Sequence, residues 1–363
     1  MSEVTPALSR LKRLQSHSLF WPLMTLFLIL SVNASLNPGF WILQWRDGHL
    51  YGSIIDILNR SAPLMLVSLG MTLVIATRGI DISVGAIVAI SASVAALMIG
   101  GSLVINNGVA IHVSRFPMPI AITCALLAAL LCGLWNGLLV ARIGLQPIIA
   151  TLILMVAGRG IAQLVTGGQI VTVYYAPYFY IGNGFLAGLP FALFIAASVY
   201  VIVHLAVTRT ALGLFIQAIG INPAAARLAG VRERLISVCV YAFCGLTAGV
   251  AGLIISSNVK SADGNNAGNL MELDAILAVT LGGTLLTGGR FNLAGSMVGA
   301  LIIQTLTSTI YSIGVPPEIN LVVKAGVVFI VMLLQSEDFR SMLRSWFVRP
   351  VTSSKHANTG SQA

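Results

Sequence analysis

Two cations lie inside hydrophobic stretches of this chain, and they are the first side chains that could do chemistry. Arg159 and Lys324 stand within apolar runs, where a charge is costly and usually faces a partner or a water-filled space. Three carboxylates, Glu272, Asp274 and Glu318, lie at the same predicted outer face and could neutralise them. We therefore predict that these cations form ion pairs with carboxylates on other helices. The alternative is that they line a polar path through the membrane. The further polar or aromatic candidates for such a path are Trp135, Asn136 and Gln163.

Catalytic and metal-binding motifs are missing from the sequence. It contains no GxxxxGK[ST] phosphate loop, no HExxH pair and no GxSxG elbow, and its five histidines show no ligand spacing. We predict no catalytic residue, no metal site and no cofactor bound by this chain. No Asp or Glu occupies the middle of a predicted span, which argues against an ion-coupled carrier but leaves backbone sodium sites open.

The composition predicts the elements that position these residues. Hydrophobic residues make up 57% of the 363 positions and charged residues 9%, with a mean hydropathy of +0.94, which excludes a soluble domain. At roughly 20 apolar residues per span, we predict an all-α integral membrane protein with about ten helices, nine or eleven being the alternatives. The spans are 19–36, 61–77, 83–104, 119–141, 147–166, 189–208, 236–257, 275–288, 291–312 and 317–335.

Lysine and arginine positions orient these spans. Fourteen fall in predicted inner connections and four in outer ones, so the positive-inside rule places both termini in the cytoplasm. The net charge of +9 follows from topology and does not indicate nucleic-acid binding. We expect a cytoplasmic segment at 1–18, a membrane domain at 19–335 with a cytoplasmic loop at 209–235, and a partly disordered cytoplasmic tail at 336–363.

The loop between the sixth and seventh spans is rich in Gly and Ala. Residues 209–231 read RTALGLFIQAIGINPAAARLAGV, in which Asn222 and Pro223 can start a short helix through a side-chain cap and a preset φ. Small residues let such a helix sit deep in a partner's groove. We predict a docking element for a cytoplasmic partner, the alternative being an ordinary connector.

Five segments in order carry a family resemblance. They are GMTLVIATRGIDISVG (70–85), GLWNGLLV (133–140), LQPIIATLILMVAGRG (145–160), AIGINPAAARLAGV (218–231) and ELDAILAVTLGGTLLTGG (272–289). Together they resemble the permease subunits of ribose-type ABC sugar importers over about residues 50–335. Three stretches, 47–63, 261–279 and 288–304, are most similar to galactofuranose-importer permeases. One departure is Arg78, where the family pattern usually has glycine, which puts a close backbone approach there in doubt.

The resemblance implies a permease of the bacterial inner membrane that moves a monosaccharide. Galactofuranose is the favoured substrate, and ribose or another pentose or hexose is the alternative. The resemblance also implies a cytoplasmic ATPase that uses ATP-Mg, a periplasmic sugar-binding protein and a second permease subunit, a heterodimer being favoured over a homodimer. The residues that match the family's ATPase-coupling segment are Arg209, Gly213, Gly220, Asn222, Pro223, Ala226 and Gly230.

Glycines in the membrane domain have two interpretations, close helix packing or hinges around the path. Residues 77–89 are weakly similar in sequence to residues 287–300, and both segments lie at predicted inner turns. This similarity supports the hinge interpretation. The candidate positions for either role are Gly79, Gly85, Gly282, Gly283 and Gly289.

Overall fold

The computed structural model describes residues 19–335, except 47, 101, 107–108 and 315, together with residue 339. The predicted membrane domain is therefore almost wholly described. The predicted cytoplasmic segment 1–18 lies outside the described residues, and so does the tail 336–363 apart from Phe339.

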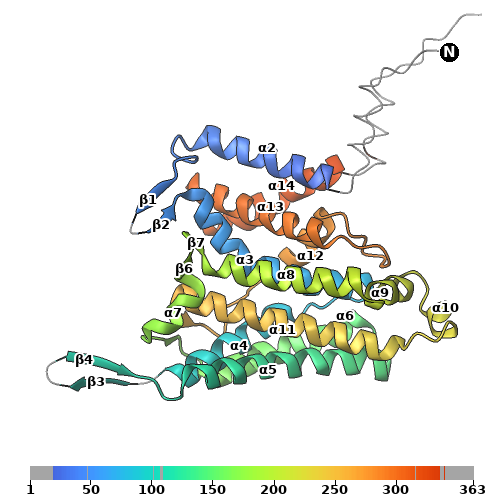
Figure 1. Cartoon of the computed structure of the whole chain (residues 1–363), viewed down its shortest axis with the longest axis horizontal. Coiled ribbons are helices and arrows are strands. Elements are labelled where there is room, and N and C mark those ends of the chain that lie inside the picture. Colours follow the sequence, from blue (N-terminus) through green and yellow to red (C-terminus); the bar gives the residue numbers. More distant parts are fainter. Residues whose placement is uncertain are drawn as a thin grey trace, which may run out of the picture.

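Apolar helices dominate the described part of the chain (Figure 1). Six of them are long and apolar enough to cross a membrane, as expected of an integral membrane protein. A π-helix, η1 (Leu139–Ile143), extends α5. The helices at the predicted span positions are α2 (Phe20–Leu36), α3 (Ser53–Ala76), α4 (Val84–Ile99), α5 (Met118–Leu138), α6 (Pro147–Thr166), α8 (Phe191–Arg209), α11 (Glu233–Val259), α12 (Met271–Leu281), α13 (Leu293–Ser312) and α14 (Pro317–Gln335).

Three predicted span boundaries were wrong. Helix α3 begins at Ser53 rather than residue 61, because its polar first turns are helical and carry an Arg60–Asp56 ion pair one turn apart. Helix α4 ends at Ile99 rather than 104, where the chain leaves for a hairpin. Helix α12 ends at Leu281 rather than 288, because Gly283 adopts a left-handed φ of 86° and turns the chain.

Short strands and small helices complete the structure, so the all-α prediction missed some elements. Backbone groups in these connections are satisfied by pairing, in four antiparallel two-stranded sheets. Helix α7 (Ala176–Asn183) was not predicted, and α9 (Leu212–Ile221) and α10 (Pro223–Leu228) form the predicted loop. The paired strands are β1 (Gln44–Arg46) with β2 (His49–Tyr51), β3 (Ser102–Asn106) with β4 (Val109–Val113), β5 (Val171–Thr172) with β8 (Ser261–Ala262), and β6 (Phe185–Leu186) with β7 (Leu189–Pro190).

Helices α3 and α11 form the centre of the bundle. Every residue of α3 from Ser61 to Ala76 is buried, as expected of a helix that is apolar on all sides. Helix α11 approaches α5 through glycines, since a Cβ on Gly245 would lie 2.6 Å from the carbonyl oxygen of Ala129. The outer faces of α5, α6 and α8 expose large apolar side chains such as Leu131, Val156 and Ile202, as expected of a lipid-facing surface.

The two ends of the bundle differ (Figure 1). Hairpins β1–β2, β3–β4 and β6–β7 gather at one end together with α7, and α9 and α10 lie at the other. We call these the hairpin end and the α9–α10 end.

Candidate functional site

The predicted docking loop folds into two short helices. Asn222 caps α10, because its side-chain oxygen accepts a hydrogen bond from the amide of Ala225 at 3.1 Å, and Pro223 occupies the first turn. The predicted capping role of Asn222 is thereby confirmed. Arg209 ends α8 and is exposed, and Gly230 adopts a left-handed φ of 84° with open space around it.

Three small residues of this loop, Gly213, Gly220 and Ala226, pack against other parts of the same chain. A Cβ on Gly220 would lie 2.0 Å from the carbonyl oxygen of Ala76, and one on Gly213 would lie 2.3 Å from that of Val207. Ala226 is also buried. Gly213, Gly220 and Ala226 therefore already pack within this chain, and the docking of this loop in a partner's groove stays a prediction.

The open face of the loop consists of apolar side chains that the sequence analysis did not single out. Leu214 is 70% exposed, Ile221 63% and Leu228 91%. They lie on two helices, because α9 ends at Ile221 and α10 ends at Leu228. A partner that docks on α9 and α10 therefore meets these side chains rather than the glycines.

Arg78 joins α9 to the bundle. Its Nε donates a hydrogen bond to the carbonyl of Gly220 at 2.7 Å, and Nη2 donates to that of Ile221 at 2.5 Å, so a cation caps the carboxyl end of α9. The amide of Gly289 donates to the carbonyl of Ala76 at 2.9 Å. The close backbone approach that Arg78 put in doubt is therefore present, with the side chain running past Gly288. The two similar segments, 77–89 and 287–300, thus meet at this junction.

Loss of this cap is expected to loosen α9. Arg78→Gly suits the residue's left-handed φ of 65° but removes both charged hydrogen bonds. We expect the amides of residues 212–221 to exchange hydrogen about tenfold faster, from roughly 1.5 kcal/mol of lost interaction. Mass spectrometry of the exchanged protein measures this. The control is Arg142→Ala, at an exposed arginine on the same end, and equal exchange in both variants would contradict the capping role.

A second polar group lies in the connection between α3 and α4. The carboxylate of Asp81 accepts hydrogen bonds from the amide and hydroxyl of Ser83, at 3.0 and 2.6 Å, and from the side chain of Asn136 at 3.3 Å. Asn136 therefore ties α5 to this connection inside the protein. Its neighbour Trp135 is 54% exposed, so these two predicted path residues face different surroundings.

Two short helices begin close to each other. At about 1.5 Å per residue, α4 and α12 are roughly 24 and 16 Å long, too short to cross a hydrocarbon layer of about 30 Å. Gly85 lies at the start of α4, and a Cβ there would be 2.2 Å from Oε2 of Glu272 at the start of α12. The amino termini of two partial helices thus meet within the protein.

Arg159 borders the same meeting point. One terminal nitrogen would lie 3.3 Å from a Cβ on Gly85, and Nη1 donates hydrogen bonds to the carbonyls of Asn265 and Ala267, at 3.1 and 2.6 Å. Gln163, one turn further along α6, donates to the side chain of Asn265. Arg159 and Gln163 therefore hold the connection before α12, which we call the 263–270 loop.

Lys324 and Asp274 form a separate pair. Their Nζ and Oδ2 atoms are 2.6 Å apart, joining α14 to α12. The predicted path residues thus lie in several places rather than lining one space: the Asp81 group, the 263–270 loop, the Lys324–Asp274 pair and the exposed Trp135. Among the described residues no three His, Cys, Asp or Glu side chains gather as a metal site would require.

The five candidate glycines fall into two groups. A Cβ on Gly79 would lie 2.4 Å from the Tyr241 hydroxyl, and one on Gly282 would lie 2.3 Å from the backbone of Gly295, so these two, like Gly85, permit close packing. Gly283 and Gly289 have left-handed φ angles of 86° and 92°, which glycine adopts without strain. Packing and turn geometry therefore account for all five positions, and a hinge role stays a prediction.

A bundle of membrane-length apolar helices around a buried central helix defines a multi-pass membrane protein. The chain belongs to the family described as branched-chain amino acid transport system / permease component, whose family model matches residues 53–333.

Relatives with curated descriptions agree with this family. The chain is 49% identical to the galactofuranose transporter permease protein YtfT of Escherichia coli (strain K12), over 89% of this chain and 93% of that one. It is 37% identical to the fructose import permease protein FruF of Bifidobacterium longum, over 91% of each chain. The ribose import permease protein RbsC of Escherichia coli is 33% identical, over 87% of this chain and 92% of that one. No solved structure gives a significant match.

Proposed function

We propose that the chain is the transmembrane subunit of an ATP-driven importer that moves a monosaccharide, galactofuranose first, across a bacterial inner membrane. The observation that carries this proposal is its 49% identity to a galactofuranose transporter permease over 93% of that protein. Similarity to fructose and ribose import permeases keeps another hexose or a pentose as the alternative substrate.

The proposed topology has ten spans with both termini in the cytoplasm. Helices at all ten predicted positions support it. The two short helices, α12 and α4, would cross the membrane together with the 263–270 loop and the connection before α4. The α9–α10 end is then cytoplasmic and the hairpin end periplasmic, since arginines such as Arg142, Arg227 and Arg232 lie beside one another at the α9–α10 end.

The proposed partner at the cytoplasmic end is an ABC ATPase that carries the ATP-Mg. Three exposed apolar residues, Leu214, Ile221 and Leu228, are the side chains that such a partner would cover. Arg78 and Gly220 then act inside the permease, because they attach α9 to α3 and to the turn at Gly289. A push on α9 would reach the centre of the bundle through this junction.

The remaining proposed partners are a periplasmic sugar-binding protein at the hairpin end and a second permease subunit. A similar but different second subunit is favoured over a second copy, from the resemblance of the motifs. The competing class is an ion-coupled carrier that acts alone, which would not need the ATPase.

Uptake into vesicles that contain this chain with its candidate ATPase, second permease and binding protein tests the proposal. We expect ATP-dependent uptake of galactofuranose. ATP-dependent uptake of ribose instead would change the sugar and keep the mechanism. Uptake that is indifferent to ATP but follows the membrane potential would favour the ion-coupled carrier and refute the importer.

A further inference from the structure

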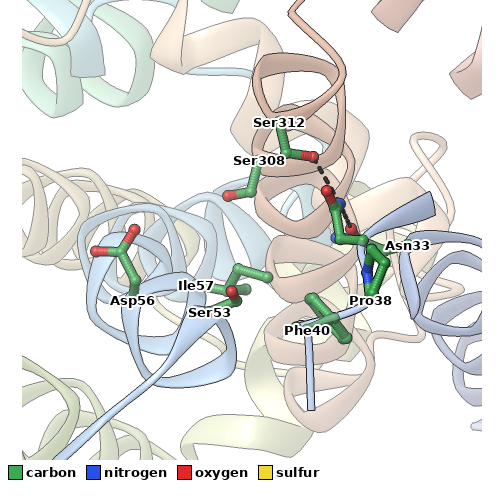
Figure 2. Close-up of a pocket in the computed structure, with 10 residues that line it drawn as sticks. Asn33, Pro38, Phe40, Ser53, Asp56, Ile57, Ser308 and Ser312 are labelled. Atoms are coloured by element: carbon green, nitrogen blue, oxygen red, sulfur yellow. Dashed lines mark hydrogen bonds between the residues drawn. The ribbon is translucent and has the colours of Figure 1, made fainter. Parts of the chain in front are cut away.

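A polar cavity lies between α2, α3 and α13 at the hairpin end, apart from every group described above (Figure 2). Its volume is about 410 Å³, within the range of about 300–1,000 Å³ that is usual for small-molecule sites. Ser53 and Ile57 of α3 face Ser308 of α13 across it. Residues from three helices therefore converge on a space large enough for a small ligand.

The hydroxyl and amide groups around this cavity are only partly used. The Asn37 amide donates hydrogen bonds to Asn33 Oδ1 at 2.6 Å and to Ser312 Oγ at 3.0 Å, which ties the end of α2 to α13. The hydroxyls of Ser53 and Ser308 have no hydrogen-bond partner among the residues that the structure describes. They remain available to a ligand that offers hydroxyl groups of its own.

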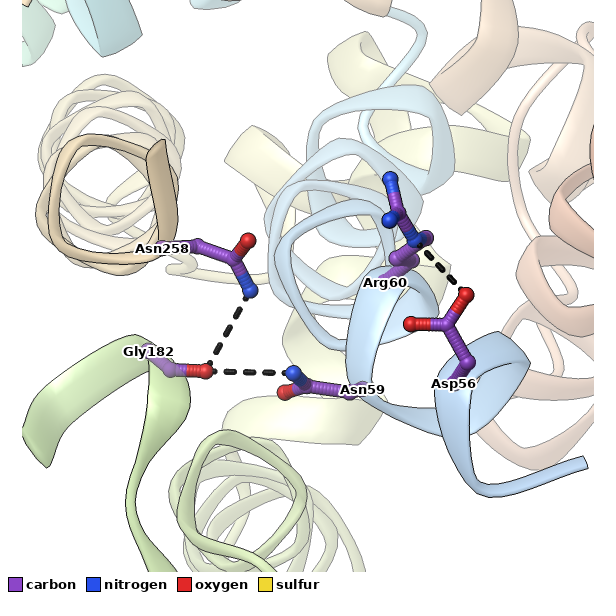
Figure 3. Close-up of polar contacts among 5 residues, drawn as sticks. All are labelled: Asp56, Asn59, Arg60, Gly182 and Asn258. Carbon is purple, nitrogen blue, oxygen red and sulfur yellow. Dashed lines mark hydrogen bonds and ion pairs between the residues drawn. The ribbon is translucent and has the colours of Figure 1, made fainter. Parts of the chain in front are cut away.

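Charge limits the chemistry of that ligand. Among the residues that the structure describes, Asp56 is the only charged one that borders the cavity, and it pairs with Arg60 at 3.0 Å on the exposed start of α3 (Figure 3). An anionic ligand, including the carboxylate of an amino acid, would meet a negative group and no free cation. The buried ring of Phe40 and Ile57 supply a small apolar surface. The lining suits a neutral molecule that carries many hydroxyls.

Polar groups continue around the start of α3. A second cavity of about 370 Å³ lies on the other side of Asp56 and is lined by Asn59 and Asn183. Asn59 and Asn258 both donate to the carbonyl of Gly182, at 3.1 and 3.3 Å (Figure 3), while the buried Oδ1 of Asn59 has no partner in the described structure. An uncompensated buried acceptor is costly, so this region also favours a ligand or water that donates.

We propose that the cavity bounded by Asn33, Ser53 and Ser308 is a binding site for a neutral monosaccharide at the periplasmic end of the permease. The proposal rests on the proposed function and adds to it the place where sugar first contacts this chain. It also separates this chain from a branched-chain amino acid permease, because the cavity lacks both a free cation for a carboxylate and a large apolar wall.

Cysteine labelling tests the site in the complete transporter. Ser308→Cys is introduced into the full complex in right-side-out vesicles and treated with a charged, membrane-impermeant methanethiosulfonate. The matched control is Thr172→Cys, at an exposed position on the same end in β5. The unsubstituted chain, which has four cysteines of its own, gives the background. ATP-dependent uptake of galactofuranose and the rate of labelling are both measured.

We expect modified Ser308→Cys to lose uptake by about tenfold or more, since the added group fills the cavity, while modified Thr172→Cys transports normally. Sugar supplied with its binding protein should slow the labelling of Ser308→Cys, and leucine should not. Normal uptake after labelling, no labelling, or protection by leucine would each overturn the site. Failure of the proposed function is distinct, because the unsubstituted complex would then show no ATP-dependent sugar uptake.

Discussion

Gly220→Val is expected to abolish ATP-dependent uptake while the chain still enters the membrane. A Cβ at this position would lie 2.0 Å from the carbonyl oxygen of Ala76 and 2.2 Å from the amide nitrogen of Gly289. Both contacts are backbone atoms, which cannot rotate aside. Helix α9 must therefore move away from Ala76 and Gly289. Overpacking of about 3 kcal/mol would reduce the fraction of molecules with α9 in its native position about a hundredfold.

The measurement is uptake per permease in vesicles with the ATPase and binding protein, with ATP hydrolysis followed in parallel. We expect hydrolysis to continue without uptake, because the substitution leaves intact the exposed side chains that we propose as the ATPase contact. The control is Gly326→Val in α14, where a Cβ would meet nothing within 4 Å, and it should transport normally. Full uptake by Gly220→Val would show that α9 does not transmit motion through this junction.

Arg159→Ala is expected to give the largest loss of stability. It removes two hydrogen bonds to the 263–270 loop and leaves the carboxylate of Glu272, which is 2% exposed, without its neighbouring cation. Together these changes should cost about 2–3 kcal/mol, mainly from the two charge-assisted hydrogen bonds. Fluorescence-detected size-exclusion chromatography after heating the detergent-solubilised protein measures the loss.

Two variants separate charge from packing. Arg159→Ala combined with Glu272→Gln should recover part of the stability, because a neutral side chain no longer needs a counter-charge. Arg60→Ala, which breaks an ion pair whose side chains are 59% and 60% exposed, should cost at most about 1 kcal/mol. If the double variant is no more stable than Arg159→Ala alone, Glu272 does not need Arg159 as a counter-charge. The loss of stability then comes from the hydrogen bonds to the 263–270 loop.

The sequence predicted the helices better than their ends. Long apolar runs located the ten helices at the predicted span positions, because hydrophobicity is a local property of the sequence that determines which segments enter the lipid. It placed the start of α3 too late, because Asp56, Asn59 and Arg60 resemble a loop although they form helical turns. It missed α7 and the hairpins, since short polar connections carry no periodic signal.

The site was predicted less completely. The cap at Asn222 was predicted correctly, and docking on this loop stays a prediction. The exposed residues Leu214, Ile221 and Leu228 were not singled out, because the motifs in this segment consist of glycine and alanine. The cavity residues Asn33, Ser53 and Ser308 were not predicted, since they come from three different helices and no local pattern brings them together.

What the sequence determined by itself is the membrane setting, the order of the helices and the permease family, because composition, charge bias and motif order are all local in the chain. Tertiary structure alone decided which residues meet. Arg78 reaches Gly220, Arg159 reaches Asn265 and Asn37 reaches Ser312, and each pair is far apart in sequence. Such contacts depend on which helices pack against one another. Local sequence patterns do not specify that packing, because it is set by the complementary shapes of side chains far apart in the sequence.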